Sequence, residues 1–306
     1  MKLGTALPTS GPYASTENIV RIAQVAERLG YHSLWTYERL LYPIAGVAMP
    51  DGSTMQLPEV YMSTYEPLET LAYVAASTQH VTLGTSIINA PFQSPVLLAR
   101  RFATLDRLSN GRVVAGLGQG WMPQEFEVSN VSIKERGKRV EEYIGALRAL
   151  WGPDPVSYDG RFYHIPASKV NPKPVQQGGI PILMGVSTPA AIQRAARLAD
   201  SINPIATTFE ALESTVTTFR LAAQEAGRDL SALKVIVRAN VPVTATPLPE
   251  GERPFLGGSP RQIAQDLARV QQLNVDEVIL TDQASRTMDE AIERLDELQT
   301  AAVALR

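Results

Sequence analysis

The chain alternates between short apolar runs rich in β-branched residues and longer segments whose apolar residues recur every three or four positions. The short runs suit strands buried on both faces, as in parallel sheets, whereas the longer spacing is that of amphipathic helices. Eight strands are predicted in this way, and each is followed by a helix. The strands are expected at residues 2–8, 32–37, 81–87, 112–118, 180–186, 201–205, 234–244 and 276–282.

Caps and helix breakers mark the ends of the predicted helices. Ser15 or Thr16 can cap the first helix, and Pro95 is placed to open the third. Asn110 and Gly111 should stop that third helix, because both residues tolerate the left-handed conformation needed there. Helices are therefore expected over residues 17–30, 67–77, 95–109, 132–151, 190–199, 209–226 and 288–305, and a further helix, capped by Ser259, follows the loop 246–258.

Eight strands alternating with eight helices predict an α/β protein built as a (β/α)₈ TIM barrel, in a single domain over residues 1–306. Such a barrel takes about 250 residues. The remainder predicts insertions after strands 2 and 4 and before helix 7: the loop 38–66, a small hairpin with an Asp-Gly turn at 155–166, and the loop 246–258. A doubly wound sheet is the alternative, but the strand number and the lack of a GxGxxG opening favour the barrel.

Polar side chains gather where the third and fourth strands end. Because ligands of such folds bind at the carboxyl ends of the strands, we expect Ser86, Asn89, Gln119 and Trp121 to meet one. The run Gly116-Leu-Gly-Gln-Gly120 alternates glycines, which lets the backbone approach a flat group closely. Taken alone, this run is a weak signal.

Two other strand ends carry candidate chemistry. At Gly185-Val186-Ser187-Thr188, backbone N–H groups, a helix dipole and hydroxyl groups would meet; a phosphate site and an ordinary helix cap explain this equally well. Glu38 is a carboxylate at the barrel mouth, and an ion pair with the adjacent Arg39 explains it better than a catalytic acid does. Aromatic residues that suit a flat ring surround the same mouth: Tyr37, Tyr42, Tyr61, Tyr65 and Trp121.

Composition narrows the range of functions. A net charge of −3 with no basic stripe argues against nucleic-acid binding. There is no cysteine, which excludes thiolate chemistry, and the three histidines are too far apart in sequence for a usual metal motif. No segment approaches the ~20 apolar residues of a membrane span, and no signal-like segment opens the chain. A cytoplasmic protein with a small-molecule substrate, no metal and no membrane partner is expected.

Three segments together resemble the bacterial luciferase-like superfamily, and more narrowly its oxidoreductases that use the deazaflavin coenzyme F420. The segments are SLWTYERLLYP, LGTSIINAPFQSPVLLARRFATLDRLSNGRVVAGLGQGWMPQEF and GVSTPAAIQRAARLADSINP. Relatives that use FMN share the central segment, so the resemblance is less specific for the cofactor than for the superfamily.

The resemblance implies a barrel with the cofactor ring at its carboxyl face. The ring would rest on a non-prolyl cis peptide, here Ser86–Ile87, near Asn89. Gln119 and Gly120 would lie beside the cofactor tail. The segment of Gly185, Val186, Ser187 and Thr188 would bind the cofactor's phosphate. Glu38, Arg39 and Trp121 would face the substrate, with Glu38 as the candidate acid or base.

Two departures from the family pattern limit the prediction. Glu38-Arg39 stands where relatives often have Asp-His, and Trp121 stands where the sugar-phosphate dehydrogenases have a glutamate. We therefore expect no oxidation of glucose-6-phosphate. An FMN-dependent monooxygenase and a non-catalytic cofactor-binding barrel are the alternatives. A homodimer is expected from the resemblance alone.

Overall fold

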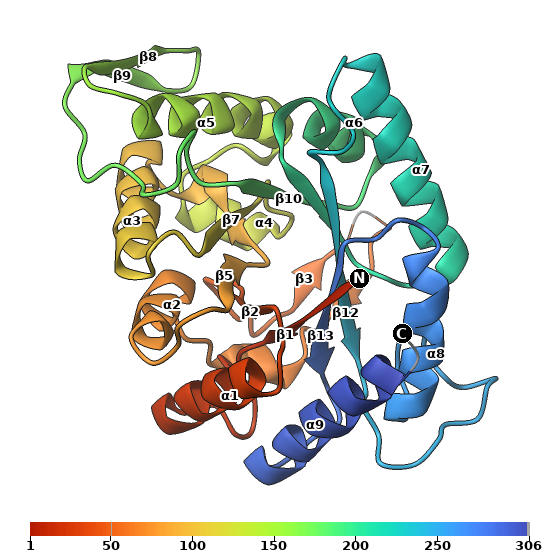
Figure 1. Ribbon diagram of the computed structural model, residues 1–306. Helices are drawn as coiled ribbons and strands as arrows, with labels where there is room; N and C mark the ends of the chain where they lie inside the picture. Colours follow the sequence, from red (N-terminus) through yellow and green to blue (C-terminus); the bar gives the residue numbers. More distant parts are fainter. Residues whose placement is uncertain (50, 305–306) are drawn as a thin grey trace.

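The computed structural model describes residues 1–49 and 51–304, and its central strands close into a parallel barrel (Figure 1). The strands follow one another in the order β10, β11, β12, β13, β1, β2, β5 and β7, and β7 pairs with β10 to close the ring. The predicted (β/α)₈ barrel is confirmed. Its strands are β1 (Lys2–Ala6), β2 (Ser33–Thr36), β5 (Thr82–Thr85), β7 (Val113–Gly118), β10 (Ile182–Val186), β11 (Ser201–Pro204), β12 (Lys234–Val241) and β13 (Glu277–Asp282).

Eight helices cover the outside of the barrel, one after each strand (Figure 1). The last was predicted to run to Leu305, but residues 305 and 306, like Pro50, lie outside the described residues. The helices are α1 (Thr16–Arg28), α2 (Pro67–Ala75), α3 (Pro95–Leu108), α5 (Arg136–Trp151), α6 (Pro189–Leu198), α7 (Phe209–Glu225), α8 (Pro260–Gln271) and α9 (Met288–Ala304). In the described part of the chain, no helix combines the length and apolarity that crossing a membrane requires.

The helix boundaries follow the predicted local chemistry. The Ser15 hydroxyl accepts a hydrogen bond from the Asn18 N–H at 3.1 Å, which caps α1. Asn110 and Gly111 both have positive φ, 55° and 80°, and end α3 as expected. Ser259 and Gln262 form a reciprocal capping box at the start of α8.

Two apolar layers hold the barrel together. The larger lies between the sheet and the surrounding helices. The smaller fills the barrel interior, where Trp35, Leu183, Ile236 and Ile279 meet from four different strands. Ile87 packs against this inner cluster, so the segment after β5 rests on a closely packed apolar floor.

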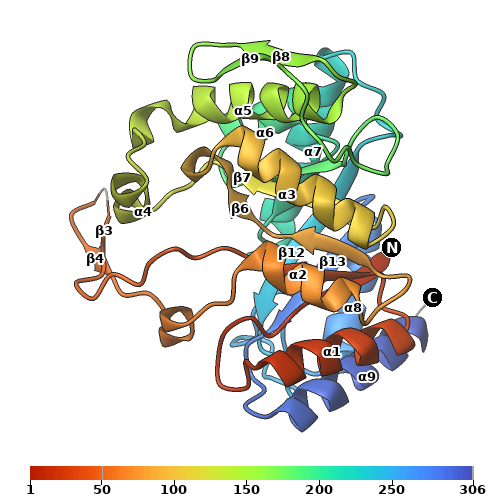
Figure 2. The same cartoon turned by 90° about the vertical axis from the view of Figure 1, so that its left-hand side faces the viewer.

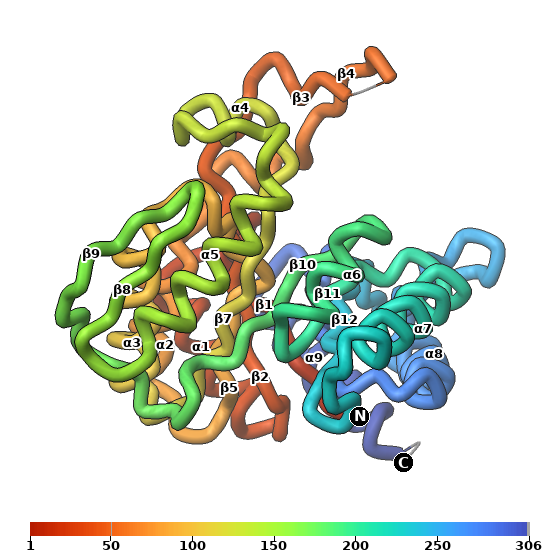
Figure 3. The backbone as a smooth tube through the Cα atoms, turned by 90° about the horizontal axis from the view of Figure 1, so that it is seen from above, coloured from red at the N-terminus to blue at the C-terminus, as the bar shows by residue number. Residues whose placement is uncertain are grey.

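The insertion after β2, residues 38–66, forms an arm that extends away from the barrel (Figures 2 and 3). It contains the short antiparallel pair β3 (Val47–Ala48) and β4 (Thr54–Met55) and the 3₁₀ helix η1 (Glu59–Met62). A helix that was not predicted, α4 (Pro123–Val128), supports it: Met122, just before α4, packs in one apolar cluster with residues of the arm. The segment between Trp121 and the next barrel helix therefore holds the arm in place, although no element was predicted there.

The predicted hairpin is present as β8 (Val156–Asp159) and β9 (His164–Ser168), but its turn differs. Asp159 pairs with His164, and the Gly160 N–H donates to the Tyr163 carbonyl at 2.9 Å. The loop is therefore four residues long, and Asp-Gly opens it rather than forming a two-residue turn. The hairpin follows α5, as the predicted order of segments has it.

Candidate active site

Ser86, at the end of β5, joins four strands of the barrel mouth. Its N–H donates to the Thr36 carbonyl at 2.6 Å, and its hydroxyl donates to the Asn203 side chain at 2.7 Å. Asn203 in turn donates to the Ile236 carbonyl at 2.7 Å. The Ser86–Ile87 peptide is cis, as the family resemblance implies. These contacts fix the backbone at the predicted ring position.

Glycines on the neighbouring strands make room for Ile87. A Cβ at Gly118 would lie 2.2 Å from the Ile87 Cδ1 atom, and one at Gly185 would lie 3.4 Å from its Cγ2. Gly118 and Gly185 thus accommodate the Ile87 side chain at the mouth, and Ile87 presents an apolar surface above the inner cluster.

Glu38 is buried, with 4% of its surface exposed, and two N–H groups bind its carboxylate. The Asn89 backbone N–H donates at 2.8 Å and the Gln93 side chain donates at 3.0 Å. Burial raises the pKa of Glu38 to about 7, with smaller contributions in the same direction from Glu66 and Glu125, and the two hydrogen bonds lower it. Glu38 can therefore gain or lose a proton near neutral pH, from a position that braces the segment 87–89.

The expected ion pair between Glu38 and Arg39 is wrong. Arg39 binds Glu125 instead, with 3.1 Å between Nη1 and Oε1, and the same oxygen accepts the Leu40 N–H at 3.0 Å. The Arg39 guanidinium also lies 5.3 Å from the Tyr61 ring and 5.5 Å from the Trp121 ring. Successive residues of an extended chain point in opposite directions, so Glu38 and Arg39 face different parts of the mouth.

The loop after β7 carries the two residues predicted to lie beside a cofactor tail. The Gln119 side-chain oxygen accepts a hydrogen bond from Arg194 of α6 at 3.3 Å. Gly120 has φ of 77°, and a Cβ there would lie 2.7 Å from Phe126 and 2.9 Å from Phe92. This position requires glycine for two separate reasons.

We expect Gly120→Ala to destabilise the protein by about 3 kcal/mol, because it adds steric overlap to a left-handed backbone. Gly227→Ala is the matched control: Gly227 has φ of 67°, but a Cβ there would meet nothing within 4 Å. Guanidinium unfolding at one pH compares the two. Equal losses would show that Phe92 and Phe126 yield without cost.

The junction from β10 to α6 was predicted to be either an ordinary helix cap or a phosphate site, and its groups are compatible with both. Thr188 caps α6 by accepting the Ala191 N–H at 3.3 Å, so the ordinary cap is real. Ser187 and Thr188 are nevertheless exposed, and Arg194 brings a guanidinium from the same helix to Gln119. Hydroxyls, a helix N-terminus and a nearby guanidinium are the chemistry that receives a phosphate.

The predicted aromatic rim divides into two groups. Tyr37 and Tyr61 contact edge to face, with ring centroids 5.7 Å apart, and line a cavity at the mouth. Tyr42 donates to the Leu57 carbonyl and packs within the arm. Among the residues that the structure describes, no group of histidine and acidic side chains could hold a metal ion.

Sequence reasoning missed Arg238, Glu125 and Arg194. Arg238 follows Ile236 by two residues on β12, so alternation puts it on the inward face of a barrel strand at its carboxyl end, which was a usable signal. Glu125 lies in the unpredicted helix α4 and contacts a residue 86 positions away. No local pattern indicates such a contact.

A family model described as luciferase-like monooxygenase matches residues 1–249. Among curated proteins, the uncharacterized protein Rv0953c of Mycobacterium tuberculosis is 35% identical over 167 residues, which is 54% of this chain and 59% of that protein. The oxygenase component of flavin-dependent trigonelline monooxygenase from Acinetobacter baylyi is 30% identical over 175 residues, 56% of this chain and 44% of that protein. The F420-dependent glucose-6-phosphate dehydrogenase of Amycolatopsis mediterranei is 30% identical over 189 residues, 60% of this chain and 51% of that protein. The chain thus matches about half the length of these relatives.

Solved structures share the whole fold at lower identity. Monooxygenase RslO1 from Streptomyces bottropensis superposes with a TM-score of 0.81 at 23% identity, covering 99% of both chains. An F420-dependent secondary alcohol dehydrogenase, solved with an F420-acetone adduct, has a TM-score of 0.78 at 17% identity, covering 100% of this chain and 99% of the other.

Proposed function

Because the chain belongs to the luciferase-like monooxygenase family, we propose that it is an oxidoreductase that transfers a hydride between the deazaflavin coenzyme F420 and a small organic substrate. The observation that carries the proposal is the combination at the barrel mouth of an apolar floor under Ile87 with an exposed, hydroxyl-bearing helix start at Ser187 and Thr188. The family uses either F420 or a flavin, and similarity to an F420-dependent dehydrogenase supports the deazaflavin.

In this proposal, each part of the mouth has a separate task. The Ser86–Ile87 segment supports the ring near Asn89, and the residues from Gly185 to Thr188, including Val186, receive the phosphate. Gln119 and Gly120 line the path between them. The deazaflavin supplies the hydride chemistry, and the protein supplies orientation and the exclusion of water.

Glu38 is the proposed proton carrier, since its pKa of about 7 suits exchange near neutral pH. Its carboxylate accepts the Asn89 N–H and its own backbone N–H donates to the Ile87 carbonyl at 3.1 Å, so a change in its charge acts next to the ring position. Arg39 and Trp121, stacked at 5.5 Å, are proposed to form the substrate side of the mouth.

Anaerobic turnover tests the proposal. The purified protein is mixed with reduced F420 and a panel of enones, ketones and imines, and recovery of the oxidised deazaflavin absorbance is followed. We expect turnover of at least one acceptor, and none of glucose-6-phosphate with oxidised F420. F420 binding without turnover would support a non-catalytic barrel. A homodimer is part of the proposal, and sedimentation velocity tests it separately.

The second candidate is an FMN-dependent monooxygenase, which similarity to the trigonelline enzyme supports. Oxygen uptake with reduced FMN, without F420 turnover, would replace the first proposal with this one.

A further inference from the structure

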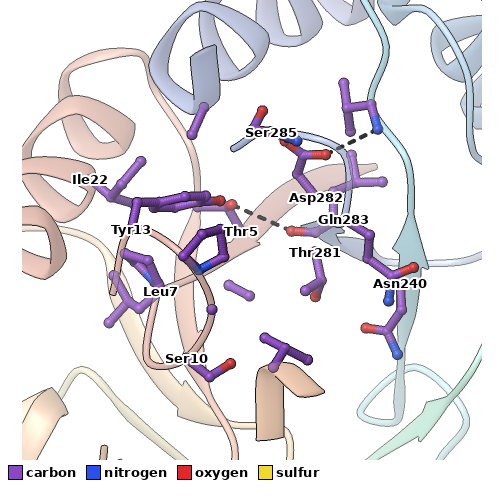
Figure 4. A pocket seen from close by; sticks show the side chains of 18 of the residues that line it. Thr5, Leu7, Ser10, Tyr13, Ile22, Asn240, Thr281, Asp282, Gln283 and Ser285 are labelled. Carbon is purple, nitrogen blue, oxygen red and sulfur yellow. Dashed lines mark hydrogen bonds between the residues drawn. The ribbon is translucent and has the colours of Figure 1, made fainter. Parts of the chain in front are cut away.

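A cavity of about 530 Å³ opens at the carboxyl ends of β1, β12 and β13 (Figure 4). Polar side chains from three segments line part of it, and they are labelled in the figure: Ser10, Tyr13, Asn240, Thr281, Asp282, Gln283 and Ser285. Apolar side chains that include Leu7, Ile22, Val60 and Leu280 line the rest. The residues proposed to hold the cofactor do not line it, so it is a separate compartment beside the ring position.

Arg238 connects this cavity to the proposed ring position. Its Nη1 donates to the Ser86 carbonyl oxygen, and its Nε donates to the Asn240 side-chain oxygen at 2.8 Å. The guanidinium lies 5.2 Å from the centre of the Tyr37 ring. The Ser86 carbonyl, the Asn240 side chain and the Tyr37 ring together fix the orientation of the guanidinium.

Arg238 has no acidic partner among the described residues. The charged or titratable groups close enough to affect it are Tyr61, Tyr37 and Arg39, and burial lowers its pKa below the ordinary value. Asp282 lines the same cavity, but its carboxylate accepts the backbone N–H groups of Val243 at 3.1 Å and Ala284 at 2.8 Å.

Arg238 is partly buried, and a guanidinium taken partly out of water without a counter-ion is stabilised by a ligand that supplies the anion. Among the described residues, neither the Nη2 atom of Arg238 nor the side-chain nitrogen of Asn240 makes a hydrogen bond, whereas the Nε and Nη1 atoms of Arg238 and the side-chain oxygen of Asn240 are paired. Two neighbouring N–H donors can receive the two oxygens of a carboxylate.

We propose that the cavity binds an organic carboxylate with an apolar body, and that Arg238 with Asn240 receives its carboxylate group. This inference rests on the proposed function and specifies its substrate class: the apolar body occupies the region around Leu7, Ile22 and Leu280, and the anionic end lies next to the ring position. Arg238 then determines the specificity for a carboxylate substrate. The hydride transfer remains the one described under the proposed function.

Calorimetric titration with a matched pair of probes tests this inference. F420-loaded protein is titrated with cyclohexanecarboxylate and with the neutral cyclohexanecarboxamide. We expect the carboxylate to bind about tenfold more tightly, because charge-assisted hydrogen bonds exceed neutral ones by about that margin. Arg238→Met should abolish the preference, and Arg238→Lys should retain part of it. Arg286→Met, which removes the same charge from an exposed residue of the same cavity, should leave it intact.

Each result has a distinct meaning. Equal binding of the two probes by the F420-loaded wild-type protein overturns the inference and leaves the proposed function standing. The inference also fails if Arg238→Met weakens F420 binding while the carboxylate preference survives, because Arg238 would then serve the cofactor. If F420 does not bind but the preference appears and depends on Arg238, the anion site stands and the proposed cofactor is wrong. If Arg238→Met does not fold, the relative affinity of the wild-type protein for the carboxylate and the carboxamide still tests the inference.

Discussion

Gly116→Ala is expected to prevent the barrel from forming, or to lower the free energy of unfolding by more than about 4 kcal/mol. A Cβ on Gly116 would lie 1.5 Å from the Thr85 carbonyl oxygen and 2.6 Å from its carbonyl carbon. Both are backbone atoms, and the Thr85 hydroxyl further ties the strands by donating to the Gly116 carbonyl at 2.7 Å and accepting its N–H at 2.9 Å. Relief would require β5 and β7 to separate where β5 leads into Ser86.

Two comparisons identify the cause of the Gly116 effect. Gly251→Ala, at a loop glycine whose Cβ would meet nothing within 4 Å, should be close to neutral. In Gly118→Ala the closest contact of the new Cβ is the end of the Ile87 side chain, at 2.2 Å, so trimming Ile87 to Ala should recover part of its loss. Urea unfolding with circular dichroism measures all of these variants. A folded Gly116→Ala protein of near wild-type stability would mean that the close approach of β5 to β7 is not required.

Glu38→Gln is expected to remove a pH dependence of about 3 kcal/mol from the stability of the protein. Because burial raises the pKa of Glu38 from 4.5 to about 7, the folded protein holds this proton more tightly than the unfolded chain does. The contribution to stability is fully present below pH 4.5 and is lost as the pH rises through about 7. Glutamine does not titrate, so the variant should lose less stability than the wild type between pH 5 and pH 8.

Guanidinium unfolding at pH 5 and pH 8 makes this comparison. The matched control is Glu125→Gln, another buried carboxylate of the mouth, which should destabilise the protein at both pH values because Arg39 loses its partner. Parallel pH profiles of Glu38→Gln and the wild type would contradict the assignment. If Glu38→Gln also left turnover unchanged, Glu38 would be a structural carboxyl and not the proton carrier.

The strand ends were the part of the site that the sequence could predict. Period-two apolar runs and glycine, proline and serine breakers are local signals, so the positions of Ser86, Gln119 and Ser187 followed from them. The ion-pair partner of Arg39 was not predictable from the sequence. The partner, Glu125, lies 86 residues away in a helix, although the acidic residue Glu38 adjoins Arg39 in the chain.

The substrate side shows a different limit. Arg238 was visible as a charged residue on the inward face of β12, but its importance depends on the absence of a counter-ion among the described residues, which only three-dimensional neighbours reveal. The cavity combines residues from β1, the arm, β12 and α9, so no single stretch of sequence outlines it. The arm is irregular and has few periodic positions from which its path could be inferred.

An equilibrium titration of the cofactor-free protein with F420 and, separately, with FMN distinguishes the two candidate cofactors. Tryptophan fluorescence reports binding, because Trp35 belongs to the cluster under Ile87 and Trp121 is 42% exposed at the mouth. Trp121→Phe identifies which of the two responds. We expect saturable quenching with tighter binding of F420 than of FMN. Tighter binding of FMN, or no binding of either, would contradict this expectation.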